Sequence, residues 1–571
     1  MRKSNWKLRN DHCNLPIEIA SYRRARVDRP VWTLGVPAFS NSRSRPGVVL
    51  VIVLVAVALL SLSALSFANL MLAERNAAQL HGRRAQCRAL ADSGLEVAKH
   101  LLTLTADELQ EAGGQYDNSQ RLRGVLVVDD DNPRNRGRFS MIAPNVKDGS
   151  LAGVRYGFED ESTRLNLNTL SLADQAVENG GRALLLALPG MTEEIADAIL
   201  DWLDEDDEPR EFGAEADYYS GLSPPYAPKN GPLDTIEELL LVRGVTPELL
   251  FGADRNRNGR IDSDEEQFAK LSQATGEGDE VDRGWVAYLT LYSKEANRRP
   301  DGRPRINLMQ DDMQTLHDEL AEVFDADSAN FIVAYRQNGP SQSKGLGVAA
   351  GSAQLDLKTP GKTKLTTVLD LIGTNVSIKP SGGGPSGGGQ SGQGRQSGQS
   401  GQGGQGDQKE QVLETPFPAV SIAMAIYLPL LMDNVTVNPA ESIPGRVNIN
   451  QASRVVLAGI PGMTDELLEA ILSHRKPEYD PNSPGRRHET WLLAEDHVKL
   501  EQMKALMPYI TGGGSTQRAQ IIGYFEEGGP AARIEVILES TGAMPRIVFW
   551  RDLSHLGRGY KLETLGVEAR E

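Results

Sequence analysis

The chain has 571 residues, 40% of them hydrophobic and 24% charged, so it is long enough to bury more than one core. Its net charge of −17 is divided unevenly, because residues 1–47 carry +7 and residues 48–571 therefore carry −24. Such an acidic body is a poor general partner for phosphates, which argues against nonspecific nucleic-acid binding. The two cysteines, Cys13 and Cys87, provide no disulfide framework.

An uncharged stretch dominates the N-terminal part of the chain. No charged residue occurs between Arg45 and Glu74. A helix over this stretch would be about 42 Å long at about 1.5 Å per residue, enough for a hydrocarbon core of about 30 Å. The basic residues before it predict a cytoplasmic N-terminus and a translocated acidic body. A signal peptide would have a shorter apolar run and a small-residue cleavage site, so a plain membrane anchor is the simplest interpretation.

The start of the apolar stretch carries a second signal. Gly47 follows basic residues at its entrance, and the helical pattern continues beyond the membrane to Leu104. This arrangement resembles the type IV pilin and pseudopilin family, and the resemblance implies cleavage by a prepilin peptidase between Gly47 and Val48. Most pilins have Glu as the fifth mature residue, where this chain has Ile52. That departure is similar to the K-class minor pseudopilins of type II secretion systems.

Strand patterns occur at both ends of the remaining chain. An amphipathic helix over residues 74–112 is followed by predicted strands at 124–128, 138–142 and 153–158, and three more strands are predicted at 519–525, 533–539 and 546–551. A helix followed by a small sheet is the pilin arrangement, so residues from about 163 to 512 are predicted to be an insertion. The predicted fold class is α+β: a pilin-like long helix packed on a small antiparallel sheet, with a large, mainly helical domain inserted between strands.

These patterns divide the chain into segments. They are a cleaved leader 1–47, a transmembrane and amphipathic helix 48–112, a first part of the sheet 113–162, a first part of the insert 163–375, a linker 376–411, a second part of the insert 412–512 and C-terminal strands 513–571. The linker is almost entirely Gly, Ser and Gln over residues 381–408. It cannot bury enough surface to offset the entropy of ordering, and flexibility is predicted.

The insert contains an internal repeat. ALLLALPGMTEEIADAILDW follows Leu165–Asn168, VVLAGIPGMTDELLEAILSHR follows Val447–Asn450, and a fainter third copy starts at Ile306. Each of the two clear copies predicts a Pro-Gly turn, a Thr N-cap (Thr192 or Thr464) and an apolar-faced helix. These units are similar to helix-hairpin-helix or SAM-like modules, some of which bind DNA. Acidic residues follow each Thr and would repel a phosphate, so a membrane-anchored DNA-binding or uptake receptor is only the alternative function.

Residues 254–265 fit an EF-hand calcium loop, with oxygen ligands at positions 1, 3, 5, 9 and 12, a carbonyl at 7 and Gly259 at 6. The predicted ligands are Asp254, Asn256, Asn258, Arg260, Asp262 and Glu265. The simpler interpretation is an acidic turn that caps a helix without metal. Because every ligand position is filled, calcium is the prediction. Its role should be structural, since no catalytic residue stands beside the loop.

A second acidic run occupies residues 201–219. Its candidate metal ligands are Asp204, Asp206, Asp207, Glu215 and Asp217. A solvated acidic loop is the favoured interpretation of this run, and a second hard-cation site is the alternative.

Enzyme signatures are incomplete throughout the sequence. Gly361-Lys362-Thr363 looks like the end of a P-loop, but Asp356 stands where the first Gly belongs. A nucleophile-elbow spelling around Ser386 lies in the low-complexity linker, and His488-Glu489 lacks a second His at the zincin spacing. We therefore predict that the protein is not an enzyme, and a membrane-bound hydrolase has only these coincidental matches.

The acidic run 201–219, residues 225–252 and the Pro-Gly-Met repeats look like the large helical domain of K-class pseudopilins. The resemblance implies a minor pseudopilin at the tip of a periplasmic pseudopilus, helping to initiate its assembly and protein export across the outer membrane. Implied partners are other minor pseudopilins, the major pseudopilin, the prepilin peptidase and the inner membrane, with no nucleic acid. Calcium is implied in the helical domain, and the body is expected in the periplasm with the N-terminus in the cytoplasm.

Overall fold

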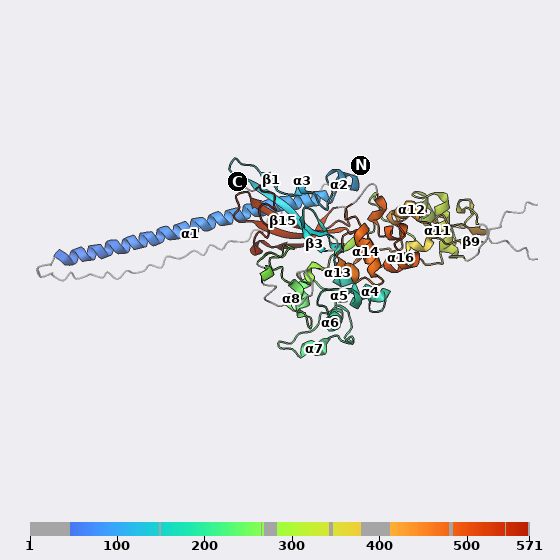
Figure 1. Cartoon of the computed structure of the whole chain (residues 1–571), viewed down its shortest axis with the longest axis horizontal. Coiled ribbons are helices and arrows are strands. Elements are labelled where there is room, and N and C mark those ends of the chain that lie inside the picture. Colours follow the sequence, from blue (N-terminus) through green and yellow to red (C-terminus); the bar gives the residue numbers. More distant parts are fainter. Residues whose placement is uncertain are drawn as a thin grey trace, which may run out of the picture. The chain divides into compact units, whose positions relative to one another are not determined.

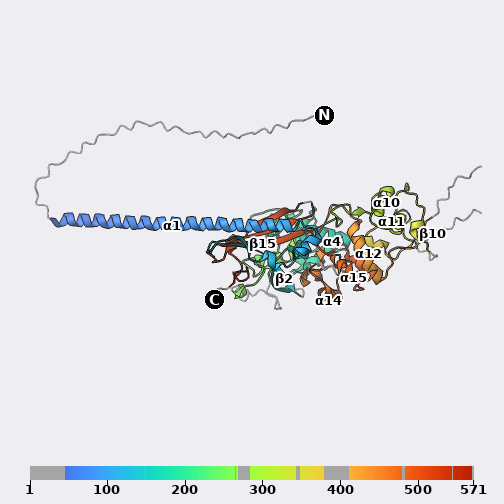
Figure 2. The ribbon, with the colours of Figure 1, turned by 90° about the horizontal axis from the view of Figure 1, so that it is seen from above.

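The computed structural model describes residues 46–147, 150–263, 265–267, 283–341, 347–378, 411–478, 483–542 and 544–568. Most of the predicted leader and linker thus lie outside the described residues. The chain divides into two compact units, Met1–Ala77 and Ala78–Glu571. Figures 1 and 2 show the ribbon in two views.

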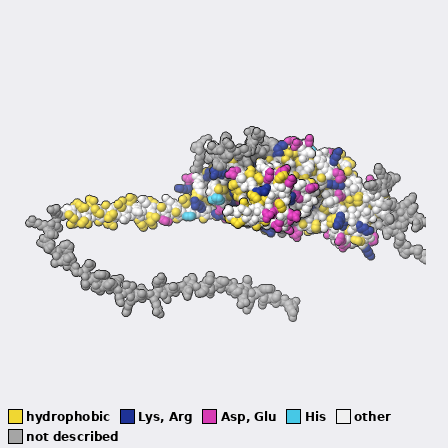
Figure 3. All heavy atoms as spheres, turned by 90° about the horizontal axis from the view of Figure 1, so that it is seen from below, with side chains coloured by type: hydrophobic (Ala, Val, Ile, Leu, Met, Phe, Trp, Pro, Cys, Tyr) yellow, Lys and Arg dark blue, Asp and Glu magenta, His cyan; other side chains and the backbone are white. Residues whose placement is uncertain are grey.

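The described part of the first unit is one continuous helix, the beginning of α1 (Pro46–Leu101). Its large hydrophobic side chains from Val48 to Leu72 are exposed, and they cover the helix in the space-filling view (Figure 3). Ser63 Oγ donates to the Leu59 carbonyl at 2.8 Å, so this hydroxyl is satisfied within the helix. Among the described residues, this is one helix long and apolar enough to cross a membrane. The prediction of a membrane-anchoring helix here is confirmed at that level.

The helix ends earlier than predicted. α1 stops at Leu101, and a separate short helix, α2 (Ala106–Glu111), follows after a turn. Thr105 and Glu108 form a capping box in which the Glu108 carboxylate accepts the Thr105 amide at 2.9 Å. Thr103 Oγ1 also donates to the His100 carbonyl at 2.7 Å. The prediction of one helix to residue 112 is wrong, because these hydroxyls favour a helix end and a new start over continuation.

The second unit contains the antiparallel sheet. Its strands are β1 (Val125–Val128), β2 (Gly137–Lys147), β3 (Ser150–Arg155), β4 (Glu159–Asp160), β15 (Thr516–Phe525), β16 (Ala532–Glu539) and β17 (Arg546–Asp552). The order is β1-β2-β15-β16-β17, with β3 paired to β2 and β4 paired to β15. Phe139 on β2 lies opposite Gly523 on β15, so strands from the two ends of the chain meet at the centre. The predicted insertion between strands is therefore present.

Two glycines let the end of α1 lie close to this sheet. A Cβ added to Gly94 on the helix would lie 2.6 Å from Ile521 Cγ2, and one added to Gly523 would lie 2.1 Å from the Cys87 carbonyl oxygen. Leu90, Ala91 and other apolar residues of the helix share a core with the sheet. This close approach fixes the face of the sheet that the helix covers. On the opposite face, Ile522 and Tyr524 pack with Tyr560 and Leu565 of the C-terminal segment.

The insert repeats one unit three times. Each copy begins with a two-residue strand in a parallel pair: β5 (Leu165–Asn166) with β6 (Leu289–Thr290), β8 (Ile306–Asn307) with β11 (Val435–Thr436), and β13 (Val447–Asn448) with β14 (Ile510–Thr511). In each copy the Asn Oδ1 accepts the amide two residues on, at 3.1, 2.9 and 2.9 Å respectively. The fainter third copy predicted at Ile306 is therefore structurally equivalent to the other two.

Helices follow each short strand. They are α4 (Leu170–Ala176), α5 (Gly180–Leu186) and α6 (Glu193–Leu203); α10 (Met313–Ala321) and α11 (Ala326–Asn338); and α13 (Arg454–Ala458) and α14 (Asp465–His474). The Thr192 and Thr464 side chains accept amides at 3.4 and 3.2 Å, which confirms both N-caps. The first and last copies share one core, whereas the middle copy forms another with α12 (Ser421–Asn434), β9 (Val376–Ile378) and β10 (Gln411–Leu413), grouped in Figure 1.

Candidate functional site

The predicted calcium loop follows the short helix α8 (Pro247–Phe251). Asp254 accepts the amides of Asn258 and Gly259 at 3.0 and 2.8 Å, and Glu265 accepts those of Asn256 and Asp262 at 3.1 and 2.9 Å. Gly259 has φ +72°, which is the left-handed conformation expected of the Gly at position 6. The first and last predicted ligands, Asp254 and Glu265, thus both accept hydrogen bonds from the backbone of the loop.

The side chains of the loop form hydrogen bonds within the loop. Asn256 Nδ2 and Asn258 Nδ2 donate to Asp262 Oδ2 at 3.0 and 2.9 Å, and the Arg260 amide donates to Asn258 Oδ1 at 2.7 Å. Burial is the main cause that raises the pKa of Asp254 to about 6, and the nearby charge of Glu265 adds to it. Within the described ranges, no three His, Cys, Asp or Glu side chains converge as a metal-binding group. The candidate metal ligands of this loop are carboxylate, amide and carbonyl oxygens, which suit Ca²⁺.

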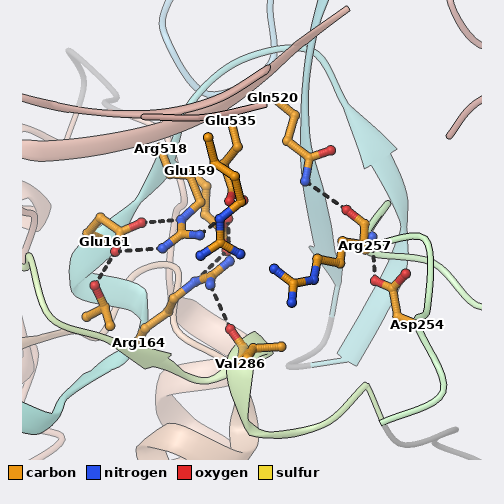
Figure 4. Close-up of polar contacts among 12 residues, drawn as sticks. Glu159, Glu161, Arg164, Asp254, Arg257, Val286, Arg518, Gln520 and Glu535 are labelled. Atoms are coloured by element: carbon orange, nitrogen blue, oxygen red, sulfur yellow. Dashed lines mark hydrogen bonds and ion pairs between the residues drawn. The ribbon is translucent and has the colours of Figure 1, made fainter. Parts of the chain in front are cut away.

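The loop is bound to the sheet by residues that the sequence did not single out. Arg533 of β16 is 0% exposed, and its guanidinium donates to the carbonyls of Asn256 (2.8 Å) and Arg257. Gln520 of β15 also donates to the Arg257 carbonyl, at 2.9 Å (Figure 4). Tyr560 Oη donates to the Asn258 carbonyl at 2.7 Å. The shape of the loop and the position of the insert on the sheet are therefore coupled.

A buried charge network lies beside this junction between the insert and the sheet (Figure 4). Arg518 of β15 pairs with Glu161 at 2.5 Å and with Glu535 of β16 at 3.1 Å. Arg164 pairs with Glu159 at 2.7 Å and donates to the Val286 carbonyl at 2.9 Å. These ion pairs thus connect strands of the sheet to the start of the insert across the junction.

Charge pairing outweighs burial in this network. Burial alone would raise the pKa of Glu159, but Arg164 and Arg518 lower it. Burial likewise opposes ionisation of Glu535, and Arg518 and Arg551 lower its pKa below the usual range. A cavity of 110 Å³ lies between the network and the predicted calcium loop, with Phe251, Phe549 and Tyr560 among its lining residues. The junction is therefore polar and ionised rather than a dry apolar core.

The second acidic run contains buried carboxylates. Among the described residues, one oxygen of Asp204 and both oxygens of Glu215 are buried without a hydrogen-bond partner. Burial and neighbouring carboxylates raise the pKa of each to about 7. Asp206 and Asp207 lie near Glu215, since their negative charges contribute to raising its pKa. Asp217 is exposed on α7 (Ala216–Ser220).

The run also holds a residue that sequence reasoning missed. Asp201 is 0% exposed on α6, and it accepts the Arg210 amide at 3.3 Å and pairs with that guanidinium at 3.6 Å. Nothing in the spacing of the acidic run distinguishes Asp201 from its solvated neighbours. The buried oxygens of Asp204 and Glu215 show that the run is not wholly solvated, although no three carboxylates of the described residues converge there.

The predicted cleavage residues lie at the start of α1. Gly47 and Val48 fall within the first turn, where Val48 is 60% exposed and a Cβ added to Gly47 would meet nothing within 4 Å. Ile52, at the position of the usual Glu, is 63% exposed. The structure therefore leaves this segment accessible.

The described residues define a membrane-anchored protein of mixed helix and sheet, with a long apolar helix, an antiparallel sheet and an inserted domain. A family model described as type II secretion system (T2SS), protein K, matches residues 163–251, which contain the first repeat and the acidic run. Residues 163–251 are therefore similar to that family, and the resemblance inferred from the sequence is confirmed through this domain.

Two individual proteins are also similar to the chain. A type II secretion system protein K from Aeromonas hydrophila is 36% identical over 133 residues, which cover 20% of this chain and 39% of the relative. The match thus spans well under half of that relative. A chain in the crystal structure of the GspK-GspI-GspJ complex from the enterotoxigenic Escherichia coli Type 2 Secretion System is 11% identical with a TM-score of 0.33, and the match covers 84% of this chain and 99% of that chain.

Proposed function

We propose that the protein is a minor pseudopilin of a type II secretion system, located at the tip of the periplasmic pseudopilus, where it helps to initiate assembly and export. The observation that carries this proposal is the protein K domain at residues 163–251, inserted into an antiparallel sheet behind a membrane-anchoring helix. The partners are other minor pseudopilins, the major pseudopilin and the prepilin peptidase. The protein has no enzymatic activity of its own.

Two features of the chain support the tip position. The insert is large, with three repeated units between β4 and β15 in the chain, and its bulk would block another subunit from stacking above. Ile52 replaces the Glu that in pilins pairs with the N-terminus of the subunit already above it. A subunit at the tip has no such neighbour, so this position needs no carboxylate.

Charge supports the proposed orientation in the membrane. The leader carries +7 and the remainder −24, so the N-terminus stays in the cytoplasm and the body crosses into the periplasm. Val48 then becomes the first mature residue after cleavage by the prepilin peptidase. The protein is accordingly a single-pass component of the inner membrane.

Calcium belongs to the proposal as a structural ion. Asp254, Asn256, Asn258, Asp262, Glu265 and the Arg260 carbonyl would hold it. When bound, it would neutralise the buried carboxylates of Asp254 and Glu265, whose like charges repel each other in one loop. Asp204, Asp206, Asp207 and Glu215 are the candidates for a second ion, because their run holds buried carboxylate oxygens without partners.

A DNA-binding or uptake receptor is not supported by the relatives found. The residues that follow the helix caps are Glu193 and Glu194 in one copy and Asp465 and Glu466 in the other. These carboxylates occupy the position where a DNA module would receive a phosphate.

A deletion strain tests the proposed role. Loss of the gene should remove a defined set of proteins from the culture supernatant and leave them in the periplasm, and the full chain should restore their export. Export should stay absent when the strain carries Gly47→Ala, which blocks cleavage. Quantitative mass spectrometry of both fractions measures the result. An unchanged set of exported proteins in the deletion strain would contradict the proposal.

A further inference from the structure

A short basic hairpin stands out on this acidic body. Residues 297–305 read Asn-Arg-Arg-Pro-Asp-Gly-Arg-Pro-Arg, which places four arginines in nine residues of a chain with a net charge of −17. Arg298 pairs with Pro304 in an antiparallel bridge, and residues 300–304 are exposed. The hairpin therefore presents concentrated positive charge at the surface of the insert.

Hydrogen bonds and proline fix the shape of the hairpin. The Arg299 amide donates to the Arg303 carbonyl at 2.7 Å, and the Gly302 amide donates to the Arg299 carbonyl at 2.9 Å. Gly302 supplies the positive φ of +84° that the turn requires, and Pro300 and Pro304 restrict the backbone on either side. The side chain of Asn297 anchors the base by donating to the carbonyls of Asn438 and Ala440, both at 2.8 Å. A fixed backbone lowers the entropy lost on binding.

Two of the four arginines are neutralised within the body. Arg303 pairs with Asp301 at 2.7 Å and Glu322 at 3.1 Å. Arg305 pairs with Glu295 at 3.1 Å, and that carboxylate also receives Arg446 and the Thr511 hydroxyl. Glu295 is therefore already saturated and has little capacity for a further cation.

The other two arginines bond to carbonyl oxygens instead. Arg298 donates to the carbonyls of Thr541 (3.0 Å) and Gly302 (2.9 Å), and Arg299 donates to the Pro304 carbonyl at 2.9 Å. Among the described residues, Arg299 Nη1 is buried without a hydrogen-bond partner. Both guanidiniums are thus held in place while their charge lacks a direct carboxylate partner.

These arginines line a groove of about 560 Å³. Other lining residues are Thr103, Leu104 and Thr105 from the turn after α1, Ser515, Ser540 and Arg487. The carboxylates of Asp301 and Glu295 also line it, and they are paired with Arg303 and Arg305. None of the large hydrophobic side chains that are exposed in the described residues lines it. A lipid surface would need such apolar anchors, and a nucleic acid would be repelled by the acidic body.

We propose that hairpin 297–305 and this groove bind acidic side chains of a partner protein. Arginine forks match carboxylates in a bidentate manner, and carbonyl oxygens hold the guanidiniums of Arg298 and Arg299 at the groove. The strongly acidic remainder of the body repels other acidic surfaces, so an acidic partner would be directed to a basic site such as this hairpin. The proposal does not depend on a role in secretion, because it rests on the charge and geometry of the groove alone.

The first test uses the full chain in detergent micelles and a fluorescein-labelled hexaglutamate peptide. Fluorescence anisotropy should show binding that weakens as salt rises. The double variant Arg298→Glu/Arg299→Glu should lose at least tenfold in affinity. The matched control Arg121→Glu/Arg134→Glu makes the same charge change on exposed residues away from the groove, and it should stay within about twofold of the wild type.

Each other outcome overturns the proposal. Equal losses in the two double variants would show only a general charge effect. Displacement of the peptide by equimolar inorganic phosphate would indicate a free-oxyanion site, and binding to anionic vesicles that is lost in Arg298→Glu/Arg299→Glu would indicate a lipid surface. Arg299→Gln removes the charge while keeping a polar N–H donor, and it should weaken peptide binding several-fold with unchanged circular dichroism, which separates loss of the contact from loss of folding.

Discussion

Replacing Arg518 by methionine is expected to lower the free energy of unfolding by about 3–5 kcal/mol, the range for breaking a buried ion pair by removing one partner. Arg518 contacts Glu161 and Glu535, and its charge also lowers the pKa of Glu159. The variant would remove the positive charge that stabilises the carboxylates of Glu161, Glu535 and Glu159. Urea denaturation of the full chain in micelles, followed by tryptophan fluorescence at pH 7, measures the change.

The loss should depend on pH in a defined direction. The pKa values of Glu159 and Glu535 are lowered in the folded protein, so their stabilisation is present above the ordinary Glu pKa of about 4.3 and is lost as pH falls. The difference between wild type and Arg518→Met should therefore shrink below about pH 4. Arg134→Met is the control, since Arg134 is 72% exposed in its pair with Glu527, which is itself 55% exposed, and it should cost at most about 1 kcal/mol. Equal effects of the two substitutions would contradict a junction held by buried charge.

Calcium is expected to stabilise the wild-type protein, and Glu265→Gln should remove that effect. At a calcium concentration of about 100 times Kd, one bound ion adds about 2.7 kcal/mol to the free energy of unfolding. Glu265 is 6% exposed and would supply the position 12 carboxylate. The measurement is the shift in urea midpoint between excess EDTA and excess calcium.

The control for this experiment is Asp131→Asn, which removes one negative charge from an exposed loop residue and should keep the full calcium shift. Hydrogen exchange adds a second readout. Because Arg533 and Gln520 bind the loop backbone, calcium should slow exchange in β15 and β16 of the wild type. A calcium shift of the same size in Glu265→Gln would place the ion elsewhere, with the acidic run around Asp204 as the first alternative.

Local patterns in the sequence were enough to predict the main elements. The uncharged run after Arg45 predicts the membrane helix, and alternating apolar residues predict β15, β16 and β17. The repeated Asn after a single apolar residue predicts three equivalent units, since each Asn caps its own turn. All of these signals are carried by residues near one another in the chain.

Long-range contacts could not be predicted in the same way. Arg518 and Glu161 are 357 residues apart, and Arg533 lies 277 residues after Asn256, whose carbonyl it binds. Neither arginine belongs to a recognisable motif, so only the fold shows that both face the insert. The break at Thr103–Thr105 was missed for a different reason, because a capping box there competes with an otherwise continuous helical pattern.

The mature N-terminus is the measurement that tests the central claim most directly. Mass spectrometry of the purified protein should find Val48 as its first residue in cells that contain the prepilin peptidase. The same measurement should find the leader intact when the peptidase is absent or when Gly47 is replaced by Ala. An intact leader in every strain would contradict a pseudopilin and would leave a plain membrane anchor that carries a protein K domain.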